Sequence, residues 1–102
     1  MSISIGPFVA GEVPEGLEYT FLDSDGVAID LTGFTATFHL KIGEAEADDL
    51  LATVSDPTEG TVTHTWLEGE LTAGALRAEF FVENGTNRYA SELLTGIVRP
   101  PV

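Results

Sequence analysis

The sequence predicts an all-β protein, and more narrowly an immunoglobulin-like antiparallel β-sandwich of about seven or eight strands in one domain over residues 1–102. Three observations indicate this fold. Apolar and polar residues alternate with a period of two along several short segments. Turn-forming residues separate these segments at spacings of roughly 8–12 residues. No segment carries the apolar stripe of a helix. A small closed barrel is the alternative arrangement of the same strands.

In the first half of the chain, strands are expected at residues 17–22, 27–29 and 34–42. The first alternates Leu17, Tyr19 and Phe21 with other residues and runs into an acidic, glycine-containing turn. The second is a short apolar segment between two turns. The third alternates over nine positions, and the side expected to face inward carries Phe34, Ala36, Phe38, Leu40 and Ile42. Ahead of them, residues 1–14 are expected to form a loose first strand or an extended arm.

In the second half, strands are expected at residues 50–54, 61–66, 75–83 and from Arg88 to Leu94 or beyond. The stretch from Gly43 towards Leu51 is acidic without an apolar face, which predicts a loop. The strand at 75–83 has an expected inner face of Leu76, Ala78, Phe80 and Val82. The dipeptide Asn84-Gly85 after it is a strong hairpin signal, because both residues accept positive φ. Prolines at the end of the chain predict an extended arm over residues 99–102.

The charge of the chain is strongly negative. Asp and Glu total 17 against 4 Lys and Arg, for a formal net charge of −13. The basic residues are scattered along the sequence at Lys41, Arg77, Arg88 and Arg99. No basic patch is visible, so we expect binding neither to nucleic acid nor to an anionic membrane surface. The acidity either keeps the isolated domain soluble until it meets its partner, or provides acidic faces for a basic partner.

The sequence contains no recognisable catalytic motif, so we expect no enzyme and no catalytic residues. Cysteine is absent, and the two histidines, His39 and His64, lie in predicted strands, where a surface or packing role is expected. A hydrolase that uses paired carboxylates is a weaker alternative. The densest acidic run, Glu44 to Asp49, is either a solvated loop or a site for a divalent cation. We expect no metal and no cofactor.

Aromatic residues and chain ends supply the candidate interface. Trp66 is expected in the core, where sandwiches often bury one tryptophan; the alternative is an exposed platform for a sugar or a partner. Phe81 shares the outward face of its strand with Arg77, and such pairs occur at interface hot spots. The candidate interface residues are Phe81, Arg77, Phe8, Val9, Arg99 and Val102.

Three segments occur in an order that resembles a known family. They are Val27 to Phe38, Gly60 to Trp66, and Leu71 to Phe80. These segments resemble the motifs D-L-T-G-a-T-v-x-F, G-x-V-x-Y-x-W and T-A-G-x-Y-x-A-E-F of the N-terminal domain family of phage baseplate upper proteins. The resemblance covers roughly residues 17–98. The sequence departs from it at His64, where tyrosine is frequent, and at Leu76, where an aromatic residue is common.

The resemblance implies an immunoglobulin-like β-sandwich that is a structural part of a tailed-phage particle, with no catalytic residues. The expected location is the virion, after synthesis in the host cytoplasm, on the capsid, at the head–tail junction or on the tail or baseplate. The expected partners are other virion proteins in a symmetric multi-copy assembly, with no nucleic acid, membrane or small-molecule substrate. The alternative is a carbohydrate-binding or host-adhesion module, which predicts an exposed aromatic residue near Trp66, Tyr89 or Phe81.

Overall fold

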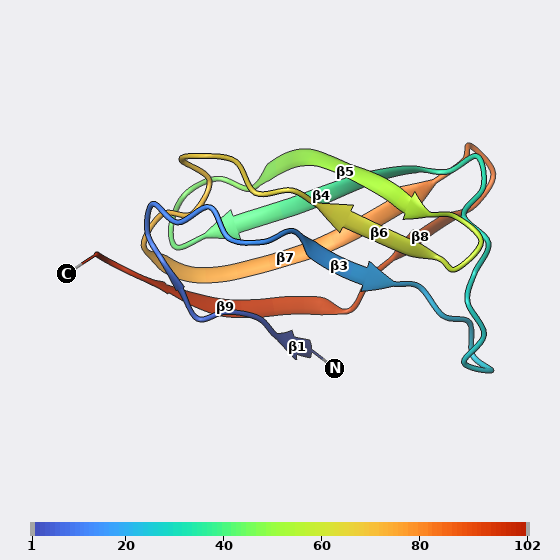
Figure 1. The fold of residues 1–102 in the computed structure, drawn as a ribbon, viewed down its shortest axis with the longest axis horizontal. Coiled ribbons are helices and arrows are strands. Elements are labelled where there is room, and N and C mark those ends of the chain that lie inside the picture. Colours follow the sequence, from blue (N-terminus) through green and yellow to red (C-terminus); the bar gives the residue numbers. More distant parts are fainter. Residues whose placement is uncertain (1, 102) are drawn as a thin grey trace.

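The computed structural model describes residues 2–101 and contains nine strands in this range (Figure 1). They are β1 (Ser2–Ser4), β2 (Phe8–Val9), β3 (Leu17–Thr20), β4 (Thr35–Ile42), β5 (Asp48–Asp56), β6 (Thr61–His64), β7 (Gly74–Glu83), β8 (Arg88–Ala90) and β9 (Leu93–Arg99). The described part of the chain contains no helix, which confirms the predicted all-β class. Accordingly, no helix in it is long and apolar enough to cross a membrane.

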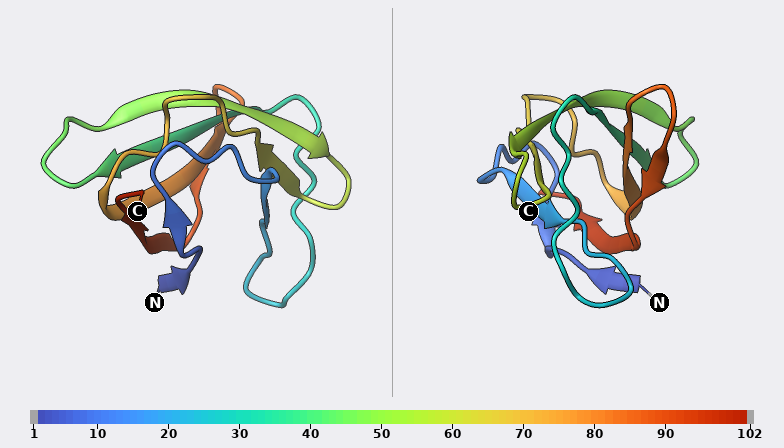
Figure 2. Two further views of the ribbon diagram at one scale, coloured as in Figure 1. Left: turned by 60° about the vertical axis from the view of Figure 1, so that its left-hand side comes forward. Right: turned by 90° about the vertical axis from the view of Figure 1, so that its right-hand side faces the viewer.

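The strands form one mixed sheet that curls into a half-barrel (Figures 1 and 2). Their order is β1-β9-β7-β4-β5-β6-β3, with β2 also paired to β9 and β8 to β7. The first part of β5 pairs with β4 and the second part with β6, so β5 belongs to both halves of the curl. Because β5 joins the two halves, the sheet is continuous and does not divide into the two separate layers that the sequence predicts. A β-sandwich is therefore not confirmed.

The N-terminal segment makes the sheet mixed. β1 and β2 both run parallel to β9, whereas the other strand pairs are antiparallel. The purely antiparallel arrangement predicted from the sequence is therefore wrong at this edge. Residues 2–9 lie beside β9 and run in the same direction as β9. Because the two segments are far apart in the sequence, no local pattern predicts that they pair.

Several predicted elements differ from those in the structure, and the strand predicted at 17–22 ends at Thr20. Residues 27–29 form no strand and contribute only a bridge between Leu22 and Ala28. The strand predicted at 61–66 ends at His64. The predicted acidic loop is shorter, because Asp48 and Asp49 already belong to β5, where they pair with β4.

A one-residue bulge at Ser91 and Glu92 separates β8 from β9, where the sequence predicts one continuous strand. Between the pairs Phe81–Ala90 and Ala78–Leu94, β7 advances three residues while its partner advances four. The Ser91 hydroxyl oxygen accepts a hydrogen bond from Phe80 N–H at 2.9 Å, and the hydroxyl donates to the Glu92 carbonyl at 2.8 Å. The extra residue shifts the alternation of β9 by one position relative to β8.

The concave side of the sheet holds an aromatic core. Phe38 and Phe80 are fully buried, and Trp66 is 2% exposed, which confirms the prediction of a core tryptophan. The Phe38 ring lies 4.8 Å from Phe80 and 5.6 Å from Trp66, measured between centroids. The predicted inner face of β7 is also confirmed, because the buried residues of that strand are Leu76, Ala78, Phe80 and Val82.

The connection between β3 and β4 is fixed by its turns. Leu31 is fully buried, and its N–H donates to the Pro57 carbonyl at 2.8 Å. Asp30 accepts hydrogen bonds from the Thr32 hydroxyl at 2.6 Å and the Thr32 N–H at 2.9 Å. These two bonds, the hydroxyl bond foremost, hold the pKa of Asp30 below its usual value because they stabilise the carboxylate. A side chain at Gly60 would meet the Ile29 carbonyl oxygen at 2.7 Å, so this position requires glycine.

Candidate functional site

The convex side of the sheet, opposite the core, is the candidate site, and we call it the outer face. Strand alternation and register place on it every second side chain of β4, β7, β8 and β9 and of the first half of β5. These residues are Thr35, Thr37, His39, Lys41, Asp49, Leu51, Ala75, Arg77, Glu79, Phe81, Glu83, Arg88, Ala90, Leu93, Thr95, Ile97 and Arg99.

All four basic residues of the chain lie on the outer face. Lys41 is on β4, Arg77 on β7, Arg88 on β8 and Arg99 on β9, and all four are exposed. Because 88 and 99 differ in parity, an uninterrupted strand would direct these two side chains to opposite faces. The bulge at Ser91 brings them to the same face.

Charge is therefore distributed very unevenly. The outer face also carries three carboxylates, Asp49, Glu79 and Glu83, so its formal charge is +1. The other fourteen of the 17 acidic residues lie elsewhere and are accompanied by no Lys or Arg, which gives the rest of the chain a formal charge of −14.

The basic side chains form no ion pair with a carboxylate in the described part of the chain. Among residues 2–101, no Lys or Arg lies within 4.0 Å of a carboxylate. Lys41 and Arg77 face each other directly across β4 and β7. Like charges in register destabilise a sheet, so this pair lowers the stability of the isolated chain. A partner that supplies an anionic group would remove that cost.

One end of the outer face is a polar hollow of about 460 Å³ around Phe81. The Arg88 guanidinium carbon lies 4.7 Å from the centre of the Phe81 ring, a cation–π contact. His39 meets the same ring edge-on at 6.2 Å. Its Nδ1 lies 2.6 Å from Asp49 Oδ1, which orients the imidazole, and Glu79 faces His39 from β7. An oriented imidazole among carboxylates can exchange protons or bind a polar partner group.

The other end is a shallow apolar groove of about 540 Å³. Its walls are the connection between β1 and β2, the start of β7 and the middle of β9. Ile97, which is 59% exposed, provides apolar surface, and Arg77 is the charged residue at the rim. Such a groove suits an aliphatic side chain with a carboxylate close to it.

The structure brings together three of the six candidate interface residues. Phe81, Arg77 and Arg99 all lie on the outer face. Phe8 is half-buried instead, with its ring 5.6 Å from Trp66, so it forms part of the core. Val9 is half-buried and pairs with Arg99 in the sheet. Val102 lies outside the described residues.

Sequence reasoning missed the contributions of Lys41, Arg88 and the pair of His39 with Asp49. Alternation alone directs Lys41 and His39 outward, so a signal for these two was present. The orientation of Arg88 relative to Arg99 depends on the bulge. The contact of His39 with Asp49 depends on the start of β5, where the sequence predicts a loop.

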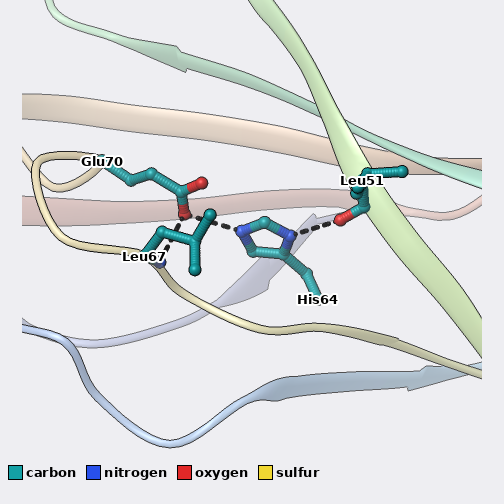
Figure 3. A network of polar contacts seen from close by, with 4 residues as sticks. All are labelled: Leu51, His64, Leu67 and Glu70. Atoms are coloured by element: carbon teal, nitrogen blue, oxygen red, sulfur yellow. Dashed lines mark hydrogen bonds and ion pairs between the residues drawn. The ribbon is translucent and has the colours of Figure 1, made fainter.

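A second polar cluster is buried beneath β5 (Figure 3). His64 is 1% exposed, and its Nδ1 lies 2.8 Å from the Leu51 carbonyl oxygen. Because a carbonyl oxygen only accepts, Nδ1–H is the donor. Nε2 lies 2.9 Å from Glu70 Oε1, which also accepts the Leu67 N–H at 3.1 Å. Both ring nitrogens are thus occupied by protein groups, so His64 is a packing residue without a free nitrogen for chemistry.

The acidic run near residue 44 does not assemble into a cluster. Glu44 and Glu46 lie in the turn after β4, while Asp49 belongs to β5 and bonds His39. Within residues 2–101, no three His, Asp or Glu side chains lie close enough together to hold a metal ion.

The sequence matches no protein-family model, and a search of curated proteins finds no significant match.

Proposed function

We propose that this protein is a non-enzymatic structural protein of a tailed-phage particle, an immunoglobulin-like module that holds neighbouring virion proteins through its outer face. The observation that carries this proposal is the outer face itself, with four exposed basic side chains that have no carboxylate within 4.0 Å among the described residues. The face also exposes Leu51 and Ile97. Open, mixed apolar and charged surfaces of this kind are typical of protein–protein contacts.

The positions of the three motif segments support the family relation at the level of the fold. Leu31 of the first segment, Val62 and Trp66 of the second, and Leu76 and Phe80 of the third are all buried. The motif residues thus specify a core and its turns, and none of these five is available to a ligand. A family defined by such residues shares a scaffold, which agrees with a structural role.

The placement of the aromatic residues favours protein contacts over sugar binding. Trp66 is buried, Tyr89 stacks on Phe34 with ring centroids 5.8 Å apart, and Phe81 is half-buried under Arg88. The Phe, Tyr and Trp residues of the described range are all buried or half-buried. A carbohydrate-binding module needs a flat exposed ring on which a sugar stacks, so we do not extend the proposal to host adhesion.

Mass spectrometry of purified particles tests the proposal. Particles released from a strain that carries the gene are separated into heads and tails, and the copy number of this chain is compared with that of the major virion proteins. We expect several copies per particle, in one of the two fractions. Presence of the chain in the host lysate but not in the particles would refute the proposal.

A matched pair of variants links incorporation to the outer face. Arg88→Glu reverses a charge on the outer face, whereas Glu46→Lys reverses a charge in the turn after β4. Both positions are exposed, so both variants are expected to fold. We expect incorporation to fall at least about tenfold for Arg88→Glu and to remain unchanged for Glu46→Lys, because like-charge contacts at an interface are strongly unfavourable.

A further inference from the structure

The outer face has a complementary surface on the same chain. Exposed aliphatic residues occur on both sides of the molecule, and those away from the outer face are Val13, Leu22, Val27 and Leu67. Each has an acidic residue adjacent in sequence, or two positions away in the case of Val27. The outer face, by contrast, combines its exposed aliphatic residues with all the Lys and Arg of the chain. The two surfaces match in both charge and polarity.

The loop between β3 and β4 combines two exposed aliphatic residues with two carboxylates. Leu22 and Val27 are 55% and 60% exposed, and Asp23 and Asp25 lie between them. The loop is preformed, because Asp23 Oδ1 accepts hydrogen bonds from the N–H groups of Asp25 and Val27 at 2.9 and 3.0 Å. A preformed loop loses little conformational entropy on binding. Figure 2 shows this loop projecting away from the sheet.

The chemistry of the groove is complementary to such a segment. The groove offers apolar surface at Ile97 and a guanidinium at its rim from Arg77, whose cross-strand neighbour is Lys41. A carboxylate placed beside Arg77 and Lys41 would neutralise two like charges that face each other in the isolated chain. Asp25 is exposed, and the structure shows no hydrogen bond from another residue to its carboxylate within the described range, so this group is available for that role.

We propose that the apolar groove at the Arg77 end of the outer face binds the Leu22–Val27 loop of a second copy of this chain. The proposal deepens the proposed function, on which it rests for its biological setting, by naming one partner of the outer face. A nucleic acid is disfavoured as the occupant, because Asp49, Glu79 and Glu83 on the same face would repel its phosphates.

This contact joins copies head to tail. The connection between β1 and β2 and the start of β7, which line the groove, lie towards one end of the long axis of the molecule, and the loop lies towards the other end (Figure 1). This axis measures 43 Å against 24 and 23 Å for the other two axes. Two different surfaces meet in the contact, so it is heterologous and repeats from copy to copy. Such contacts close into a ring or continue as a filament.

Sedimentation velocity of the purified chain tests the proposal. We expect the weight-average sedimentation coefficient to rise with protein concentration in about 100 mM salt, the lower of two salt concentrations, where the Debye length of about 10 Å partly screens the repulsion between the net charges of the copies. We expect this rise to be largely lost in about 500 mM salt, where the Debye length is about 4 Å. A monomer at every concentration in low salt would overturn the proposal.

Charge reversal identifies the two surfaces. Arg77→Glu and Asp25→Arg are each expected to weaken association at least about tenfold, and the double variant, which has the net charge of the natural chain, is expected to restore it. Glu46→Arg changes the net charge as Asp25→Arg does and is expected to leave association no weaker than in the natural chain. Failure of the double variant to restore association would overturn the proposed pairing, provided that its circular dichroism matches that of the natural chain.

The two proposals fail in different ways. A chain that is found in particles but stays monomeric in low salt refutes the head-to-tail contact and leaves the virion role intact. A chain that associates as predicted but is absent from particles refutes the virion role and leaves the contact intact.

Discussion

Replacing Glu70 with alanine removes the carboxylate that faces His64 inside the molecule. In the natural chain, Glu70 Oε1 serves both His64 Nε2 at 2.9 Å and the Leu67 N–H at 3.1 Å. The substitution leaves a ring nitrogen without a partner at a position that is 1% exposed. The stacking of His64 on Phe38, with centroids 4.3 Å apart, holds the imidazole in place, so it cannot turn towards water without disturbing the core.

The expected loss of stability follows from the burial of the pair. A buried polar group left unpaired costs about 1–3 kcal/mol. The Glu70 side chain is 13% exposed, so in the variant water partly takes its place as the hydrogen-bond partner of His64. We therefore expect a loss of about 2–3 kcal/mol for Glu70→Ala. At about 4 °C per kcal/mol, this corresponds to a fall in Tm of roughly 8–12 °C.

Urea denaturation followed by tryptophan fluorescence measures this loss. Trp66 is the only tryptophan, is buried, and lies 4.9 Å from His64 between ring centroids, so its emission reports on the same region. Glu70→Gln keeps an acceptor for the Leu67 N–H and a polar group for His64 and is expected to lose only about 1 kcal/mol. Glu68→Ala, an exposed neighbour, is expected to stay within about 0.5 kcal/mol of the natural chain. If Glu70→Ala is no less stable than Glu68→Ala, the structural role assigned to the pair is wrong.

Two further predictions concern single hydrogen bonds. Thr32→Val removes the main cause of the lowered pKa of Asp30, so that pKa should rise towards its usual value in an NMR carboxyl titration. A lowered pKa in the folded state stabilises the protein above the unfolded pKa, and this stabilisation disappears as pH falls through the folded pKa; Thr32→Val should therefore reduce the loss of stability in acid. No change in either quantity would contradict this assignment. Ser91→Ala leaves the buried Phe80 N–H without its acceptor and should cost about 1–3 kcal/mol in denaturation, against little for the exposed control Ser24→Ala.

Local patterns predicted the secondary structure well where the strands are long. The inward faces of β4 and β7 follow directly from alternation, because one side of each strand packs on the core. The arrangement of the strands in the sheet was harder to predict from the sequence. The parallel pairing of β1 and β2 with β9 joins opposite ends of the chain, and the sharing of β5 between two halves depends on its two partners. Neither feature has a local signature.

The candidate site was predicted in part for the same reason. Alternation on β7 was sufficient to direct Phe81 and Arg77 outward together. The sequence does not show that all four basic residues lie on one face, because their positions in the sequence are far apart and the sheet register decides which of them share a face. The pairing of His64 with Glu70 was also hidden, since it depends on the loop after β6 folding back so that the Glu70 N–H bonds the Leu67 carbonyl at 3.2 Å.

Because of the bulge at Ser91, the set of side chains on the outer face depends on the number of residues between β8 and β9. Deleting a single codon here would let β8 and β9 run on as a regular strand, and every side chain of one of them would exchange sides. The side chains of Arg99 and Ile97 would then point towards the core, and those of Val98 and Leu94, which are buried in the natural chain, would point towards solvent. Among related sequences that conserve this sheet, insertions and deletions should therefore be rare between residues 90 and 93, although that segment is a break between strands, where length changes are ordinarily tolerated.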